Sequence, residues 1–168
     1  WRHLTLLQRH RILARVAAEL RRRRGDLIGA AAANTGKVFT EADVEVSEAV
    51  DFAEYYPYSA GAFFNIDHLQ CRGKGVGVVI SPWNFPIAIP CGGIAASLAA
   101  GNTVLFKPAS AAVLTAWELV QCFYRAGVSK RVLQFIPCSG SLAGAELTGG
   151  AGRGALPALA LAHPVGAA

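Results

Sequence analysis

Three short motifs in this sequence carry side chains that could take part in a reaction. The first occupies residues 81–86, a loop that contains two prolines and follows a run of β-branched residues. The side-chain amide of Asn84 in this loop could donate a hydrogen bond to an oxyanion, and one such preoriented donor stabilises a transition state by about 3 kcal/mol. Alternatively, Asn84 only bonds the backbone of its own loop.

A lysine and a pair of glycines make up the other two motifs. Lys107 follows the apolar run 103–106, and its ammonium could bind an oxygen-rich ligand or simply reach solvent along its aliphatic stem. Gly140 and Gly144 follow a third apolar run, and a glycine turn at a helix N-terminus could contact a phosphate through its backbone N–H groups. Taken alone, the glycine pair is a weak signal.

The spacing of apolar residues predicts the elements that hold these motifs. Short buried strands are expected over 76–80, 103–106 and 132–136, with helices over 87–100 and 113–124 between them. Such alternation predicts a βαβαβ unit with a parallel sheet, and ligands of these sheets bind at the carboxyl ends of the strands. All three motifs follow strands, so we expect Asn84, Lys107 and the Gly140 turn to face a single groove.

Helices are also predicted before the first strand. Apolar positions between Leu13 and Ala31 indicate one bent helix or two, interrupted at Gly25 and Asp26. A further helix is expected to start at Thr40, with Asp43 at the capping-box position, and to end near Pro57. A connector of mixed character then follows as far as residue 72.

Composition narrows the class of protein. The chain has 168 residues, enough for one domain, with 53% hydrophobic residues and only 16% charged ones, where about 25% is usual. This composition excludes disorder for most of the chain and favours strands covered on both faces, or a piece of a larger body.

The net charge is +5, but the basic run at 21–24 is followed by six acids and has no interleaved aromatic residues, so a nucleic-acid partner is not expected.

Four cysteines lack the spacing of a metal site or a disulfide scaffold, so we expect no metal and a cytoplasmic location. Residues 75–106 carry no charge at all, but prolines and glycines interrupt them too often for a membrane-spanning helix. A membrane-associated interaction protein therefore stays only as an alternative. The chain contains no Met, which suggests that the true start is missing.

Together these motifs resemble the aldehyde dehydrogenase superfamily over roughly residues 7–148. The similarity lies in residues 80–86, 99–109, 126–128 and 140–144, in the family's order. Residues 34–37, 48–56 and 133–137 look most like the glutamate semialdehyde (1-pyrroline-5-carboxylate) dehydrogenase module of bacterial bifunctional proline-utilisation proteins. The resemblance implies a Rossmann-like cofactor-domain fragment over 73–148, preceded by a helical part over 1–72 and followed by an irregular, possibly frame-shifted tail over 149–168.

The resemblance also assigns roles. Asn84 would hold the oxyanion formed when a cysteine thiolate attacks a small-molecule aldehyde, and Lys107 would bind the ribose hydroxyls of NAD. A glutamate stands at the position of Ser110 in many members, so the neutral serine leaves NADP possible. Positions assigned to cofactor binding are Ile80, Ser81, Pro82, Trp83, Lys107, Ser110, Gly140 and Gly144.

The chain also departs from the family. The family's nucleophilic cysteine and its glutamate base lie downstream of the matched region, and none of the four cysteines stands in the required motif. We therefore expect a fragment truncated at both ends, inactive alone, from an enzyme that forms a homo-oligomer. A non-catalytic nucleotide-binding module is the alternative.

Overall fold

Three helices precede a βαβαβ unit in the computed structural model, which describes residues 1–148. The predicted tail, 149–168, lies outside the described residues. The elements before the sheet are α1 (Leu6–Arg22), α2 (Arg24–Thr35) and α3 (Phe39–Phe64). The elements that follow are β1 (Val76–Ile80), α4 (Ala88–Ala99), β2 (Thr103–Lys107), the short 3-10 helix η1 (Ser110–Ala112), α5 (Val113–Arg125), β3 (Leu133–Phe135), α6 (Gly140–Ala143) and a π-helical turn, η2 (Gly144–Thr148).

The sheet within residues 1–148 has the order β1-β2-β3, and both neighbouring pairs are parallel. Val79 pairs with Phe106, and Phe106 pairs with Phe135, so the three strands advance side by side. This confirms the predicted α/β class and parallel sheet. The third strand is shorter than the predicted 132–136, although a backbone bond from Ile136 N–H to the carbonyl oxygen of Phe106 extends the pairing by one residue.

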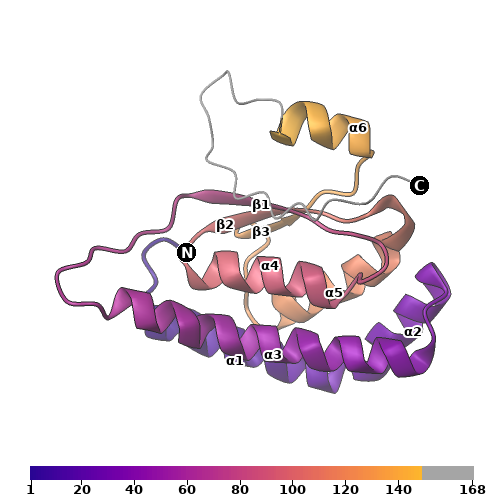
Figure 1. Cartoon of the computed structure of the whole chain (residues 1–168), viewed down its shortest axis with the longest axis horizontal. Helices are drawn as coiled ribbons and strands as arrows, with labels where there is room; N and C mark the ends of the chain where they lie inside the picture. Colours follow the sequence, from indigo (N-terminus) through magenta and orange to yellow (C-terminus); the bar gives the residue numbers. More distant parts are fainter. Residues whose placement is uncertain (149–168) are drawn as a thin grey trace.

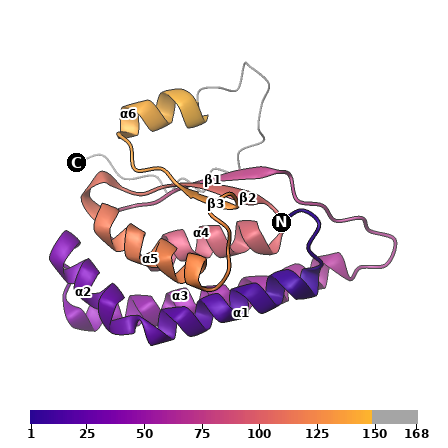
Figure 2. The same cartoon turned by 180° about the vertical axis from the view of Figure 1, so that it is seen from behind.

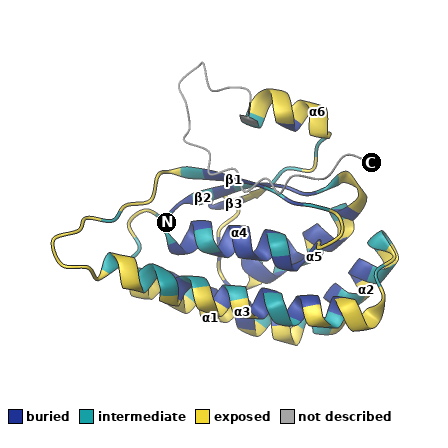
Figure 3. Ribbon diagram, viewed as in Figure 1, coloured by how far each residue is buried: buried dark blue, intermediate teal, exposed yellow. Residues whose placement is uncertain are grey.

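The elements form layers that are visible in Figure 1 and, from behind, in Figure 2. Helices α4 and α5 lie against one face of the sheet, α1 and α3 lie beneath them, and α6 stands on the opposite side of the sheet. Figure 3 shows the most deeply buried segments between these layers. The core contains side chains from the sheet and from all five longer helices, among them Phe106, Leu98, Phe123, Leu20 and Leu27.

Helix α4 explains the long uncharged stretch. It lies between α3 and the sheet, and most of its residues are buried, so it has little surface on which charges could sit. Gly92 permits the close approach, because a Cβ atom there would lie 3.0 Å from the ring of Phe52 on α3. Gly101 follows the C-terminal end of α4 and has a φ of +92°, a conformation that favours glycine. Within residues 1–148 no helix is both long and apolar enough to cross a membrane.

The first two helices meet at Arg23, not at the predicted Gly25 and Asp26. Arg23 leaves helical geometry (φ −101°, ψ 21°), and its guanidinium binds Asp26 and, on α5, Glu118. Gly25 instead lies inside α2, because glycine only lowers helix stability by about 1 kcal/mol and tertiary contacts can outweigh that. The chain therefore turns where a side chain anchors it to α5.

Helix α3 differs from its prediction at both ends. It begins at Phe39 with Val38 at the N-cap, so the predicted cap at Thr40 is wrong, and the Asp43 carboxylate binds Arg24 of α2 instead. It also continues through Pro57 to Phe64, past the predicted end. Proline removes one backbone hydrogen bond from a helix, but the helix continues through Pro57, whose side chain is buried.

Side chains of the N-terminal helical part also form hydrogen bonds with backbone groups at the ends of α4 and α5. Glu45 accepts hydrogen bonds at the start of α4, and the Trp1 indole donates to the carbonyl oxygen of Leu98 near its end. Asn34 accepts hydrogen bonds at the start of α5, and Arg15 donates to the carbonyl oxygen of Ala126 at its end. Some of the backbone groups that these helices leave unpaired at their ends are therefore bonded by residues 1–45.

Candidate functional site

The three loops predicted to carry chemistry start side by side at the carboxyl edge of the sheet. Ile80 pairs with Lys107 at the ends of β1 and β2, and Ser81 N–H donates to the carbonyl oxygen of Lys107 at 3.2 Å. The bond from Ile136 to Phe106 places the end of β3 beside them. The strand ends thus form one continuous edge.

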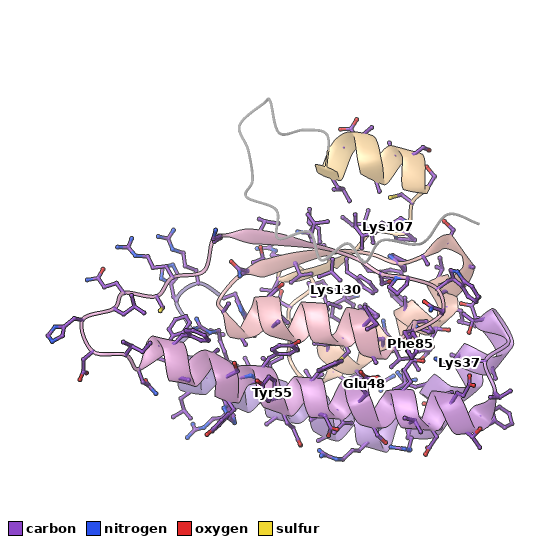
Figure 4. The ribbon with its side chains drawn as sticks, viewed as in Figure 1. Lys37, Glu48, Tyr55, Phe85, Lys107 and Lys130 are labelled. Carbon is purple, nitrogen blue, oxygen red and sulfur yellow. The ribbon has the colours of Figure 1, made fainter. Side chains whose placement is uncertain are left out.

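The side chain of Lys107 lies on the α6 side of the sheet. Phe106 is fully buried against the helices, and successive side chains of a strand point to opposite faces. Figure 4 shows Lys107 between the sheet and α6. Ile80 is its register partner and shares that face. Lys107 is only 6% exposed, so its aliphatic stem does not simply extend into solvent.

Helix α6 provides the glycine turn on that same side. Ser139 caps it, because its hydroxyl accepts a hydrogen bond from the N–H of Leu142. Within residues 1–148, a Cβ atom at Gly140 or Gly144 would meet nothing within 4 Å, so packing among these residues does not require glycine at either position. Ser110 is exposed at the start of η1, three residues after Lys107.

The loop that carries Asn84 leaves the edge toward the helices. Ser81 and Pro86 are buried and Pro82 is half-buried, whereas Trp83, Asn84 and Phe85 are exposed. Asn84 and Phe85 line a pocket of about 570 Å³ together with Lys37 and three glutamates of α3, Glu41, Glu45 and Glu48. Lys107 is not among the residues that line it. Within residues 1–148, Lys107 and Ile80 thus lie on the α6 face of the sheet, and the Asn84 loop lies on the α3 side of the same carboxyl edge.

Two residues that the sequence did not single out for a role hold this loop. Glu45 of α3 is 1% exposed, and its Oε1 accepts hydrogen bonds from the N–H groups of Ile87 (2.6 Å) and Ala88 (3.0 Å). Lys37 Nζ lies 2.7 Å from Oε2 of Glu45 and donates to the carbonyl oxygen of Asn84 at 2.9 Å. The only sequence signal for Lys37 was its place in the resemblance, and there was none for Glu45.

The thiols near the core are not activated. Burial raises the pKa of the Cys91 thiol far above its ordinary range, and the neighbouring Cys122 raises it further. Burial also raises the pKa of Cys122 to about 11. A thiolate is the nucleophilic form of cysteine, so neither side chain is suited to attack at neutral pH. No cluster of three metal-binding side chains occurs within residues 1–148.

Comparison with known proteins shows which sequences this chain is similar to. Residues 1–154 match the aldehyde dehydrogenase family. The chain is 41% identical over 160 residues to a 1-pyrroline-5-carboxylate dehydrogenase of Geobacillus kaustophilus, covering 86% of this chain and 30% of that protein. These matches confirm the resemblance drawn from the loop motifs.

Solved structures of related proteins are also similar to this chain. Proline Utilization A (PutA) from Corynebacterium freiburgense superimposes with a TM-score of 0.82 at 40% identity, over 86% of this chain and 15% of that one. A Thermus 1-pyrroline-5-carboxylate dehydrogenase with bound NAD gives 0.77 at 36% identity, over 84% of this chain and 30% of that one. The chain thus spans less than a third of the length of these relatives.

Proposed function

This chain belongs to the aldehyde dehydrogenase family, and from that premise we propose that it forms part of the cofactor domain of an enzyme that oxidises glutamate semialdehyde to a carboxylate. The names of its relatives, 1-pyrroline-5-carboxylate dehydrogenase and PutA, support this substrate. The share of those proteins that it covers supports the view that the chain alone is inactive.

We propose that NAD binds at the carboxyl edge on the side of α6. The observation that carries this proposal is the pairing of Ile80 with Lys107 on the face toward α6, because a lysine with a buried stem there offers its ammonium to ribose hydroxyls. Open space around a Cβ position at Gly140, within residues 1–148, fits a close approach of the cofactor to the turn between Gly140 and Gly144. Ser81, Pro82 and Trp83 would border the groove where β1 ends.

NAD supplies the acceptor for hydride when it is bound. Asn84 would donate its side-chain amide to the oxyanion of the aldehyde adduct, as a fixed dipole aimed at developing charge. The cysteine nucleophile and the glutamate base would come from residues that are not part of this chain. The four cysteines all carry free thiols, which fits the proposed cytoplasmic location, and we also propose that the intact enzyme is a homo-oligomer.

Calorimetric titration of the chain with NAD tests the proposal. We expect Lys107→Ala to weaken binding at least about tenfold, which corresponds to about 1.4 kcal/mol. The matched control is Lys130→Ala, because Lys130 is an exposed lysine beside Tyr124 on the α5 side. A wild-type chain that does not bind NAD, or equal loss in both variants, would refute the proposed site.

A further inference from the structure

The main chain of the Asn84 loop is fixed from outside by one charged pair. Lys37 lies just before α3 and Glu45 lies within it, and they are 47 and 42 positions away from their bonding partners Asn84 and Ile87. The ammonium of Lys37 binds the carbonyl oxygen of Asn84, and the carboxylate of Glu45 binds the N–H groups of Ile87 and Ala88. The pair therefore bonds the backbone of the loop on both sides of Phe85 and Pro86.

Both charged side chains that hold the loop are largely buried. The side chain of Lys37 is 9% exposed and that of Glu45 is 1% exposed, so the two opposite charges compensate each other where little water reaches them. The Lys37 ammonium also lies 4.2 Å from the centre of the Phe85 ring, a cation–π contact that fixes the residue next to Asn84 (Figure 4). Because Glu45 also bonds the first turn of α4, the loop and this helix are held in one geometry.

We propose that Lys37 and Glu45 are positioning residues, which act through the backbone of residues 84–88 to orient the Asn84 amide toward the reacting oxyanion. This role rests on the proposed function of Asn84. A donor aimed at developing charge is effective only when its direction is set before the reaction, and a misplacement of about 1 Å can cost about a hundredfold in rate. Neither residue needs to touch the substrate to have this effect.

Nuclear magnetic resonance of the chain labelled with ¹⁵N at asparagine tests the proposal. The sequence has four asparagines, and Asn84→Asp identifies the signals of Asn84. We expect a backbone order parameter at Asn84 of about 0.85 in the wild-type chain and below about 0.6 in Lys37→Met, which keeps the apolar stem but removes the ammonium. Lys37→Arg retains the charge and should restore most of the order.

Two further variants separate positioning from loss of stability. Glu45→Gln keeps an acceptor for Ile87 and Ala88 but removes the anion that holds Lys37, so Asn84 should again become mobile while α4 stays capped. Asn34→Ala removes two hydrogen bonds from the start of α5 and is the matched control, because it should lower stability without changing the Asn84 signals. Should Lys37→Met not fold, the comparison of Glu45→Gln with Lys37→Arg decides.

An Asn84 that stays rigid in folded Lys37→Met and Glu45→Gln overturns the proposal. So does an equal loss of order in Asn34→Ala. These outcomes are independent of the proposed function, which fails if the wild-type chain does not bind NAD whatever the mobility of Asn84.

Discussion

The side-chain oxygen of Asn34 accepts a hydrogen bond from the backbone N–H of Leu114, 80 residues further along the chain, at 2.9 Å. A second bond, from the N–H of Thr115, reaches the same oxygen at 3.2 Å. Asn34 belongs to the last turn of α2, yet it serves as the cap of α5. The helix after Lys107 and Ser110 therefore depends on a residue that lies before the sheet.

Replacing Asn34 with alanine should destabilise the chain by about 1 kcal/mol, because this is the usual cost of losing the side chain that caps a helix. Urea unfolding followed by circular dichroism measures the change. Asn34→Asp retains an acceptor and should lose less. The exposed Asn65, whose side chain makes no hydrogen bond within the described residues, provides the control Asn65→Ala, which should leave the midpoint nearly unchanged. Equal effects of the two alanine variants would contradict the capping role.

Two of the four thiols should react quickly with a disulfide reagent at pH 8 in the native chain. Cys71 and Cys138 are partly exposed, whereas Cys91 and Cys122 are buried, and burial raises the pKa of Cys122 to about 11. The buried pair should react only after urea is added. Absorbance of the released thiolate counts the reactive groups. Three or four fast groups would show that the core around Cys91 opens readily.

The ion pair between α2 and α3 predicts weaker stability in acid. The Arg24 guanidinium, through its hydrogen bond, lowers the pKa of the Asp43 carboxyl from its ordinary 3.8, and Arg21 lowers the pKa of Glu54 in the same way. Because the folded pKa lies below the unfolded one, this stabilisation is present above about pH 4 and is lost as the pH falls through the folded value.

Urea midpoints measured from pH 6 to pH 2.5 should therefore fall, and Asp43→Asn should flatten part of that fall. Arg24 also donates to the carbonyl oxygen of Asp43 and to the Ser47 hydroxyl, both at 2.8 Å, so the variant should still fold. An unchanged pH profile in Asp43→Asn would mean that this carboxyl does not contribute.

Ser110 should govern the choice between NAD and NADP if the proposed site is correct. Ser110 is exposed and neutral, whereas a glutamate there would repel a 2′-phosphate, so Ser110→Glu should weaken NADP binding by about tenfold and leave NAD binding similar. Titration with both cofactors measures the ratio. Ser110→Gln has nearly the same size without the charge and should behave like the wild-type chain. A strong preference of the wild-type chain for NAD would contradict this role.

The strands could be predicted because each is a short β-branched or apolar run between glycine and proline signals, as at Gly75 and Pro82. The end of α3 could not, because the burial of Pro57 depends on tertiary packing that no local pattern records. The same holds for Glu45, whose hydrogen-bond partners lie 42 and 43 residues away. Spacing placed Lys107 at the sheet edge, but it did not indicate the direction in which the Asn84 loop leaves that edge.

The bonding of α4 and α5 by Trp1, Arg15, Asn34 and Glu45 has a consequence for how the chain folds. These contacts join residues that are 42 to 111 positions apart, so no ribosome-bound intermediate lacking residues 87–126 can close them. High contact order of this kind slows folding. Until the second half of the chain emerges, the N-terminal helices would therefore expose the apolar faces that later pack against α4 and α5. Exposed apolar surface of this kind is what chaperones bind.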